Sequence, residues 1–270
     1  MGSGIAEVCS VVGAEVTFVE STDALVAAGR ERIERSIRKA VERGKLQDRD
    51  AEAALGRIRG LVDVRGLAES DLVIEAATED VDAKLAIFRT LGEVTPPGVP
   101  LASNTSSIPI VELAVASGRP EGVIGMHFFN PPPVMKLLEL TPALTTSDET
   151  VAFAREYAEL LGKTVVVSKD QAGFIVNRLL IPFLNDAARL HDEGFATRED
   201  IDRGVSLGLG HPMGPLALMD LIGIDTCVNI AAVLMREFGD PKFAAPPVLK
   251  RMVAAGRLGK KSGRGFYEYE

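Results

Sequence analysis

His127 and Glu139, twelve positions apart, have the side-chain types needed to move a proton. His127 ends a short apolar run at 123–127, just before a proline-rich turn, and Glu139 lies in the next apolar run at 136–140. Each run predicts a buried strand, so both side chains are expected near one sheet edge. An imidazole, whose ordinary pKa is about 6.5, can accept an alcohol proton, and a facing carboxylate would hold its tautomer. Taken as unrelated residues, His127 would be a hydrogen-bonded core histidine and Glu139 a solvated strand end.

The N-terminal residues contain half of a dinucleotide-binding pattern. Gly2 belongs to a turn of small residues that leads directly into a predicted helix, and Glu20 follows a predicted strand at 14–19. In such a unit, backbone amides at a helix N-terminus bind a pyrophosphate and an acidic residue after the second strand binds ribose hydroxyls. A carboxylate at Glu20 would favour NAD over NADP. An ordinary helix start and a strand-end acid explain the same residues about equally well.

Strand and helix patterns alternate over the first part of the chain and then give way to helices alone. The predicted strands are 14–19, 72–76, 99–102, 123–127, 136–140 and 164–167. The predicted helices between them are 23–43, 48–58, 80–94 and 147–161. Further helices are predicted at 172–192, 198–207, 214–238 and 245–255. The alternation predicts an α/β, doubly wound parallel sheet domain at 1–168, and the remainder a smaller all-helical domain at 169–270.

Composition excludes several classes of protein. Hydrophobic residues make up 46% of the 270 residues and charged residues 25%, which is typical of a globular chain. The formal net charge of −8 argues against a general binder of nucleic acid or of anionic membranes. Cys9 and Cys227 are far apart and belong to no cluster, so neither a disulfide framework nor a metal site is predicted. Without a signal sequence or an apolar run of spanning length, the expected compartment is the reducing cytoplasm.

Several longer motifs follow one another in the order of a known family. They are SNTSS at 103–107, GMHFFNP at 125–131, KLLE at 136–139, GFIVNR at 173–178, HPMGP at 211–215 and GKKSGRGFY at 259–267. With them, essentially the whole chain resembles the L-3-hydroxyacyl-CoA dehydrogenase family, most closely its short-chain 3-hydroxybutyryl-CoA members. The resemblance implies NAD-dependent interconversion of 3-hydroxyacyl-CoA and 3-ketoacyl-CoA in fatty acid metabolism. It also implies that His127 and Glu139 form a catalytic dyad.

The resemblance also assigns residues that bind the substrate's C3 oxygen. Ser106 and Asn177 match the family's hydrogen-bonding residues at that atom, where donors would stabilise a developing alkoxide. Ser106 could equally cap a helix that begins near Ile108, and Asn177 could make a purely structural hydrogen bond.

Further positions match residues that contact the cofactor or the coenzyme A of the substrate. The cofactor positions, besides Ser106, are Glu79, Lys84, Asn104, Asn130 and Lys261. Glu79 and Lys84 could instead be an exposed charge pair, and Lys261 a solvated charge of the tail. For the phosphates of coenzyme A, the family's basic patch corresponds to Ser36, Arg43 and Lys45. The alternative there is an ordinary solvated helix face.

The chain departs from the family at its N-terminus. Met1 and Gly2 coincide with the end of the family's glycine fingerprint, so its first strand and first two glycines are missing. That strand is central in a doubly wound sheet, and without it two strands would have unpaired inner edges. We expect that roughly 10–15 residues encoded upstream of Met1 form this strand and loop, a number estimated from the typical length of a strand.

The same sequence leaves two alternative functions open and predicts a homodimer. A related dehydrogenase could act on a free hydroxy acid, and a non-catalytic relative could have a damaged cofactor loop. The apolar segments 216–219 and 230–234 predict a homodimer through the helical domain, as the resemblance also implies. Burial of both segments within one chain's own core is the alternative.

Overall fold

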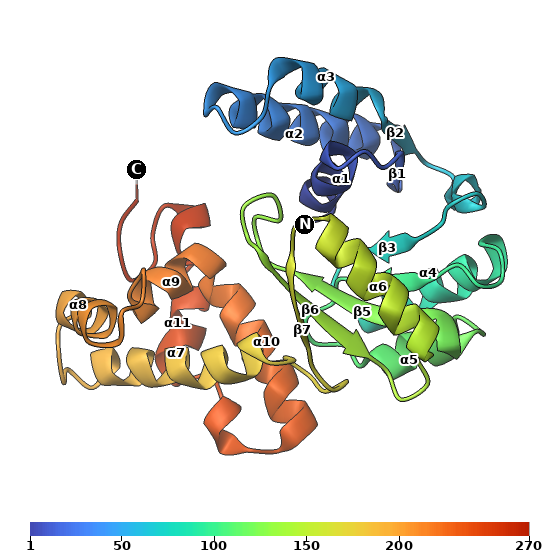
Figure 1. Cartoon of the computed structure of the whole chain (residues 1–270). Helices are drawn as coiled ribbons and strands as arrows, with labels where there is room; N and C mark the ends of the chain where they lie inside the picture. Colours follow the sequence, from blue (N-terminus) through green and yellow to red (C-terminus); the bar gives the residue numbers. More distant parts are fainter. Residues whose placement is uncertain (270) are drawn as a thin grey trace. The chain divides into compact units, whose positions relative to one another are not determined.

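The computed structural model describes residues 1–269 and divides them into two compact units. The first unit comprises Met1–Gln171 and the second begins at Ala172, three residues after the predicted start of the helical domain (Figure 1). Strands occur in the first unit, while the named elements of the second unit are helices.

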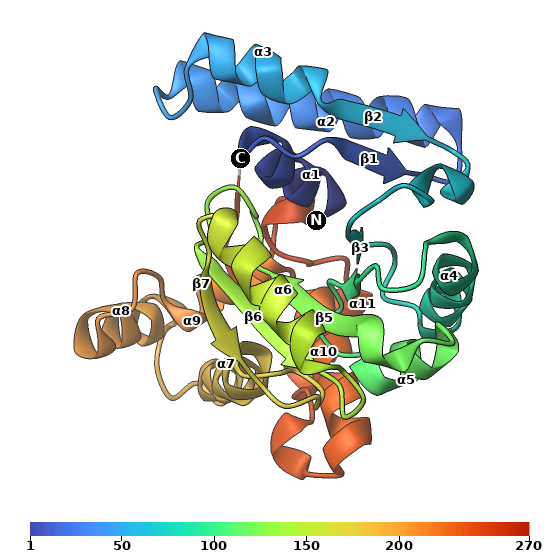
Figure 2. The same cartoon turned by 45° about the vertical axis from the view of Figure 1, so that its right-hand side comes forward.

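The sheet of the first unit is in two pieces. Strands β1 (Val16–Val19) and β2 (Ile58–Leu61) pair in parallel. The second piece runs in the order β3 (Val73–Glu75), β4 (Leu101–Ser103), β5 (Val123–Phe128), β6 (Leu137–Pro142) and β7 (Thr164–Val167). Among the described residues β1 and β3 are not paired with each other, as Figure 2 shows. This is the arrangement expected of a doubly wound sheet without its central strand.

Two details of the sheet differ from the prediction. Strand β6 is antiparallel to β5, because the connection 129–136 is too short for the crossover of about a dozen residues that parallel neighbours need. Strand β2 was not predicted, and the helix expected at 48–58 ends at Gly56. Arg59 and Gly60 give β2 no apolar alternation, so only its pairing with β1 reveals it.

Six helices of the first unit surround these strands. They are α1 (Gly2–Val11), α2 (Asp23–Glu42), α3 (Asp48–Gly56), α4 (Val81–Val94), α5 (Ile110–Ala116) and α6 (Asp148–Leu160). Side chains of Thr22, Asp80 and Ser147 accept backbone N–H bonds at the starts of α2, α4 and α6. Short 3-10 turns occupy Val64–Leu67 and Pro120–Gly122. Helix α1 lies between the sheet and the two helices α2 and α3. Ala6 packs against α2 and α3, whereas Ile5 and Val8 pack against the sheet.

The second unit is a bundle of five helices, with 3-10 turns at Pro241–Phe243 and Lys260–Ser262. The helices are α7 (Val176–Asp192), α8 (Arg198–Leu209), α9 (Pro215–Ile222), α10 (Ile224–Phe238) and α11 (Pro247–Ala254). The single helix predicted at 214–238 is wrong, because Gly223, at φ +104°, separates α9 from α10. Among the described residues no single helix is long and apolar enough to span a membrane. In the same part of the chain, only the pair α9 and α10 taken together is long and apolar enough, and these two helices are bent by 93° relative to each other.

The apolar segments that predicted a dimer lie largely inside this bundle. Leu216, Met219, Ala231 and Leu234 are buried in its core. Burial within the chain therefore explains them, and they give no support for a dimer. The tail is anchored by Asp220, whose carboxylate accepts the backbone N–H of Phe266 at 2.9 Å and the hydroxyl of Tyr269 at 3.0 Å.

Candidate active site

The predicted pair of His127 and Glu139 comes together across two neighbouring strands. The residues face each other directly in the antiparallel pairing of β5 and β6, so their side chains leave the sheet on the same side. Nδ1 of His127 lies 2.7 Å from Oε2 of Glu139. Both side chains are buried, and the Glu139 carboxylate is fully so. Glu139 is therefore not a solvated strand end, and its carboxylate fixes the orientation of the imidazole ring.

Lys84 is held by a carboxylate that the sequence did not suggest as a site residue. Its ammonium lies 2.7 and 2.8 Å from the two oxygens of Glu75, the last residue of β3. Both side chains are almost completely buried, at 1% and 2% exposure. Glu79, 42% exposed at its side chain, lies 3.5 Å from the same ammonium. The alternative of an exposed Glu79–Lys84 pair is wrong for Lys84, which is a buried cation between two carboxylates.

Glu79 also holds the loop that follows β4. Its Oε1 accepts hydrogen bonds from the Thr105 hydroxyl at 2.6 Å, the Ser106 N–H at 2.9 Å and the Ser107 hydroxyl at 3.0 Å. Burial on its own raises the pKa of the Glu79 carboxyl, but these donors and the Lys84 ammonium outweigh it and lower the pKa below its usual value. Glu79 therefore remains an anion that fixes the 104–107 loop.

Ser106 does not act as a helix cap. Helix α5 begins at Ile110, and it is the Thr105 hydroxyl that accepts the N–H of Ile108, at 3.0 Å. The N-terminus of α5 is capped from a distant part of the chain, since Asp170 accepts the N–H of Ile110 at 2.7 Å and that of Val111 at 2.8 Å. The half-buried Ser106 side chain is within 3.5 Å of Glu79 Oε1.

Asn104 ties this loop to the strand that ends beside His127. Its side-chain oxygen accepts the N–H of Phe128 at 2.9 Å, and its own N–H donates to the Glu75 carbonyl at 2.8 Å. The carboxyl ends of β3, β4 and β5 are thus joined by hydrogen bonds. Asn130 lies just beyond β5, is exposed, and precedes a cis peptide bond to Pro131.

The remaining predicted cofactor residues of the first unit lie at the starts and ends of its elements. Gly2 begins α1, whose N-cap residue Met1 provides no side-chain hydrogen bond, so the first N–H groups of the helix need other acceptors. Glu20 directly follows β1 and is half-buried. A dinucleotide pyrophosphate suits such a helix N-terminus, and ribose hydroxyls suit a carboxylate at a strand end. Gly2 therefore fits the pyrophosphate of NAD, and Glu20 fits a ribose of NAD.

The three residues predicted for coenzyme A lie along α2 and after it. Arg43 and Lys45 are exposed at the end of the helix, and Ser36 is half-buried on its body. Burial raises the pKa of Glu7 of α1, and the nearby Ser36 hydroxyl only partly opposes this rise. On the solvated face of α2 the charges pair along the helix, Arg30 with Glu34 and Arg35 with Glu31. The exposure and pairing of these charges fit a ligand-binding patch and an ordinary solvated helix face equally well.

Two predicted residues belong to the second unit. Asn177 lies in the first turn of α7, three residues after Phe174, and both Gly173 and Phe174 have positive φ. Lys261 lies in the 3-10 turn near the end of the chain, with its ammonium 2.7 Å from Asp225 Oδ2 at the start of α10. Lys261 is 48% exposed at its side chain, so it is a partly exposed, paired cation.

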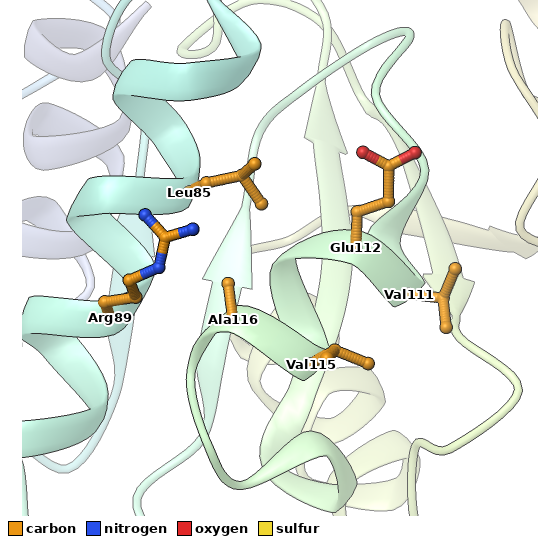
Figure 3. A pocket seen from close by; sticks show the side chains of 6 residues that line it. All are labelled: Leu85, Arg89, Val111, Glu112, Val115 and Ala116. Atoms are coloured by element: carbon orange, nitrogen blue, oxygen red, sulfur yellow. The ribbon is translucent and has the colours of Figure 1, made fainter.

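A groove between α4 and α5 lies apart from these residues (Figure 3). It encloses about 410 Å³ and is lined by Leu85, Arg89, Val111, Glu112, Val115 and Ala116. None of the predicted site residues lines it. Among residues 1–269 no group of three or more histidine, cysteine or acidic side chains is arranged to hold a metal ion.

Comparisons with known proteins agree along the whole chain. The model of the 3-hydroxyacyl-CoA dehydrogenase NAD-binding domain matches residues 1–171, and that of the same family's C-terminal domain matches 173–269. A 3-hydroxybutyryl-CoA dehydrogenase of Mycobacterium tuberculosis is 51% identical over 271 residues, covering all of this chain and 95% of that protein. The crystal structure of M. tuberculosis FadB2 superposes with a TM-score of 0.99 at 50% identity, covering 100% of this chain and 95% of that one. That of (S)-3-hydroxybutyryl-CoA dehydrogenase PaaH1 from Ralstonia eutropha gives 0.95 at 45% identity, with the same coverage.

Proposed function

This chain belongs to the 3-hydroxyacyl-CoA dehydrogenase family, and we propose that it interconverts short-chain 3-hydroxyacyl-CoA and 3-ketoacyl-CoA, with 3-hydroxybutyryl-CoA as substrate. The observation that carries this proposal is the buried contact of 2.7 Å between His127 and Glu139. NAD, when bound, supplies the hydride acceptor for oxidation and the hydride donor for reduction. The chain's own side chains move the proton and bind the C3 oxygen of the substrate.

His127 is the general base and acid of the proposed mechanism. Its Nδ1 is engaged by Glu139, so the ring's Nε2 is the atom that takes the hydroxyl proton during oxidation and returns it during reduction. The imidazolium formed on the way is stabilised by the facing Glu139 carboxylate. The two buried side chains cannot rotate away without breaking their contact, so the base stays oriented before substrate arrives.

Ser106 and Asn177 are proposed to donate hydrogen bonds to the C3 oxygen of the substrate. Such donors stabilise the alkoxide character that develops as the proton leaves. The attachment of the 104–107 loop to Glu79 supports this role for Ser106, because a donor on a fixed loop needs little reorganisation.

The cofactor contacts are proposed from the position of each residue in the fold. Gly2 offers backbone N–H groups at a helix N-terminus, and Glu20 accepts ribose hydroxyls. The other proposed contacts are Glu79, Lys84, Asn104, Ser106, Asn130 and Lys261. Ser36, Arg43 and Lys45 are proposed to bind the phosphates of coenzyme A, as one hydrogen-bond donor and two exposed cations.

We also propose that the protein works as a cytoplasmic homodimer. Both cysteines are unpaired thiols, which suits a reducing compartment. On the second unit, Phe195, Leu207 and Leu209 are largely exposed, and burial of such side chains against a second copy would support a dimer.

The test is the loss of NADH absorbance on addition of acetoacetyl-CoA, with free acetoacetate and NADPH as matched controls. Turnover with acetoacetyl-CoA and NADH, lost in His127→Asn, supports the proposal. Turnover with free acetoacetate instead would assign a free hydroxy acid as substrate. A folded protein that neither binds NADH nor turns over either compound would be a non-catalytic relative.

A further inference from the structure

Three buried side chains, those of Glu75, Lys84 and Ser103, meet at the carboxyl ends of β3 and β4. Glu75 Oε1 accepts the N–H of Ala77 at 2.6 Å and Lys84 Nζ at 2.7 Å. Its Oε2 accepts Lys84 Nζ at 2.8 Å and the hydroxyl of Ser103, which is fully buried, at 2.7 Å. Each oxygen of the Glu75 carboxylate therefore accepts two hydrogen bonds, and all of these donors belong to the first unit.

The ammonium of Lys84 faces two carboxylates at unequal distances. It lies at hydrogen-bond distance from both oxygens of Glu75 but 3.5 Å from Glu79 Oε2. Oε1 of Glu79 is occupied by the 104–107 loop, while within residues 1–269 Oε2 has only this longer contact with Lys84. Since Glu79 is the exposed member of the three, its Oε2 is the oxygen able to accept a hydrogen bond from a ligand.

We propose that Glu75 is a positioning residue for the cofactor: it holds the Lys84 ammonium away from Glu79 and so leaves Glu79 Oε2 for a cofactor hydroxyl. The proposal rests on the proposed function, because it assumes that Glu79 contacts NAD. Without the Glu75 charge, a buried ammonium has only one carboxylate partner and moves the short distance to it. Glu79 Oε2 is then occupied by Lys84 and is lost to the cofactor.

The backbone of Glu75 makes a separate connection toward His127. The Glu75 backbone carbonyl receives Asn104, which in turn holds Phe128 beside His127. These contacts use backbone and amide groups, so a change confined to the Glu75 carboxyl leaves them in place. Its effect should therefore appear in NADH binding and not in the proton transfer at His127.

The decisive variant is Glu75→Gln, which keeps the shape and removes the charge. We expect its Kd and KM for NADH to rise about tenfold, the effect of one lost charge-assisted hydrogen bond, with kcat at saturating NADH within about threefold of wild type. NADH fluorescence gives Kd, and the acetoacetyl-CoA assay gives KM and kcat. Glu7→Gln is the matched control, because it is the same change in another buried acid of this unit. It should leave the Kd for NADH unchanged.

A second variant separates positioning from folding. Removing one partner of a buried ion pair destabilises a protein strongly, whereas replacing both with apolar side chains is often neutral. Glu75→Leu combined with Lys84→Met should therefore melt near the wild-type temperature. Because this variant has no ammonium to occupy Glu79 Oε2, it should bind NADH more tightly than Glu75→Gln does. A wild-type Kd in folded Glu75→Gln overturns the proposal, as does a fall in kcat with KM unchanged. A folded double variant that binds NADH no better than Glu75→Gln also overturns it. If the wild-type protein itself fails to bind NADH, the proposed function fails first, which is a distinct result.

Discussion

His127 Nδ1 and Glu139 Oε2 lie 2.7 Å apart because antiparallel pairing places the two residues directly opposite each other on β5 and β6. A parallel neighbour would reach this position only through a longer crossover connection. The short turn after His127 thus does two things: it reverses the chain and brings the carboxylate to the imidazole. Both side chains are therefore held by neighbouring strands of one sheet.

Glu139→Gln should lower kcat by about 10²–10⁴, because an amide neither holds the required tautomer nor stabilises the imidazolium. The KM for NADH should change little, since the change is confined to the proton-transfer pair. Steady-state kinetics with acetoacetyl-CoA measure both. Glu156→Gln, on the exposed face of α6, is the control for the loss of one carboxylate. A loss of less than tenfold in Glu139→Gln would remove Glu139 from the mechanism.

Asp170→Ala should destabilise the protein by about 1–2 kcal/mol, because it leaves two N–H groups at the start of α5 without their carboxylate acceptor. Asp170→Asn, which keeps one acceptor oxygen, should lose less. Urea unfolding followed by circular dichroism gives the difference, and the exposed Asp71→Ala serves as control. Equal stability of Asp170→Ala and wild type would show that α5 does not need this cap.

The sequence predicted the parts of this structure that depend on local pattern. Alternating apolar strands and amphipathic helices indicated the two-part architecture, and the spacing of His127 and Glu139 indicated their pairing. Glu75 was missed, although an acidic residue inside the apolar run 72–76 was a visible signal. A charge in a buried strand needs a partner, and that requirement could have led to Lys84.

Other features depend on contacts between distant residues. Strand β2 exists only through its pairing with β1, and the cap at α5 joins residues 60 positions apart. The break at Gly223 was missed because a glycine within a helical pattern costs only about 1 kcal/mol and does not by itself end a helix. The charges at 79 and 84 taken alone did not show that Lys84 is buried, because its closest partner is Glu75 at the end of β3.

Both cysteines should resist thiol reagents in the native protein. Burial raises the pKa of the Cys9 thiol, and it raises that of Cys227 to about 12. At pH 8 the reactive thiolate of Cys227 is then about one part in ten thousand. A colorimetric thiol assay should detect both thiols promptly in denaturant and neither promptly in buffer. Fast native labelling would mean that these helices open readily. Cys9→Ser and Cys227→Ser would show which thiol had reacted.

Glu79→Gln should be less stable than wild type at neutral pH, and the difference should shrink in acid. The pKa of Glu79 is lowered in the folded protein, so its ionised form stabilises the fold above the unfolded pKa of about 4.3. That contribution is lost as the pH falls below this value and passes through the folded pKa. Unfolding at pH 7 and at pH 3 tests the sign. A difference that is the same at both pH values would contradict it.

Leu207→Glu should convert a dimer into monomers. Leu207 is 80% exposed in the last turns of α8, and Phe195, just before this helix, is 78% exposed. Burying such side chains against a second copy would remove apolar surface from water, at about 25 cal/mol per Å², whereas a carboxylate buried there without a partner would oppose association. Light scattering after size-exclusion chromatography measures the mass. Leu144→Glu is the control, because Leu144 is 96% exposed but belongs to the first unit. A wild-type monomer would refute the proposed homodimer, whereas a Leu207→Glu dimer would place its interface on another surface.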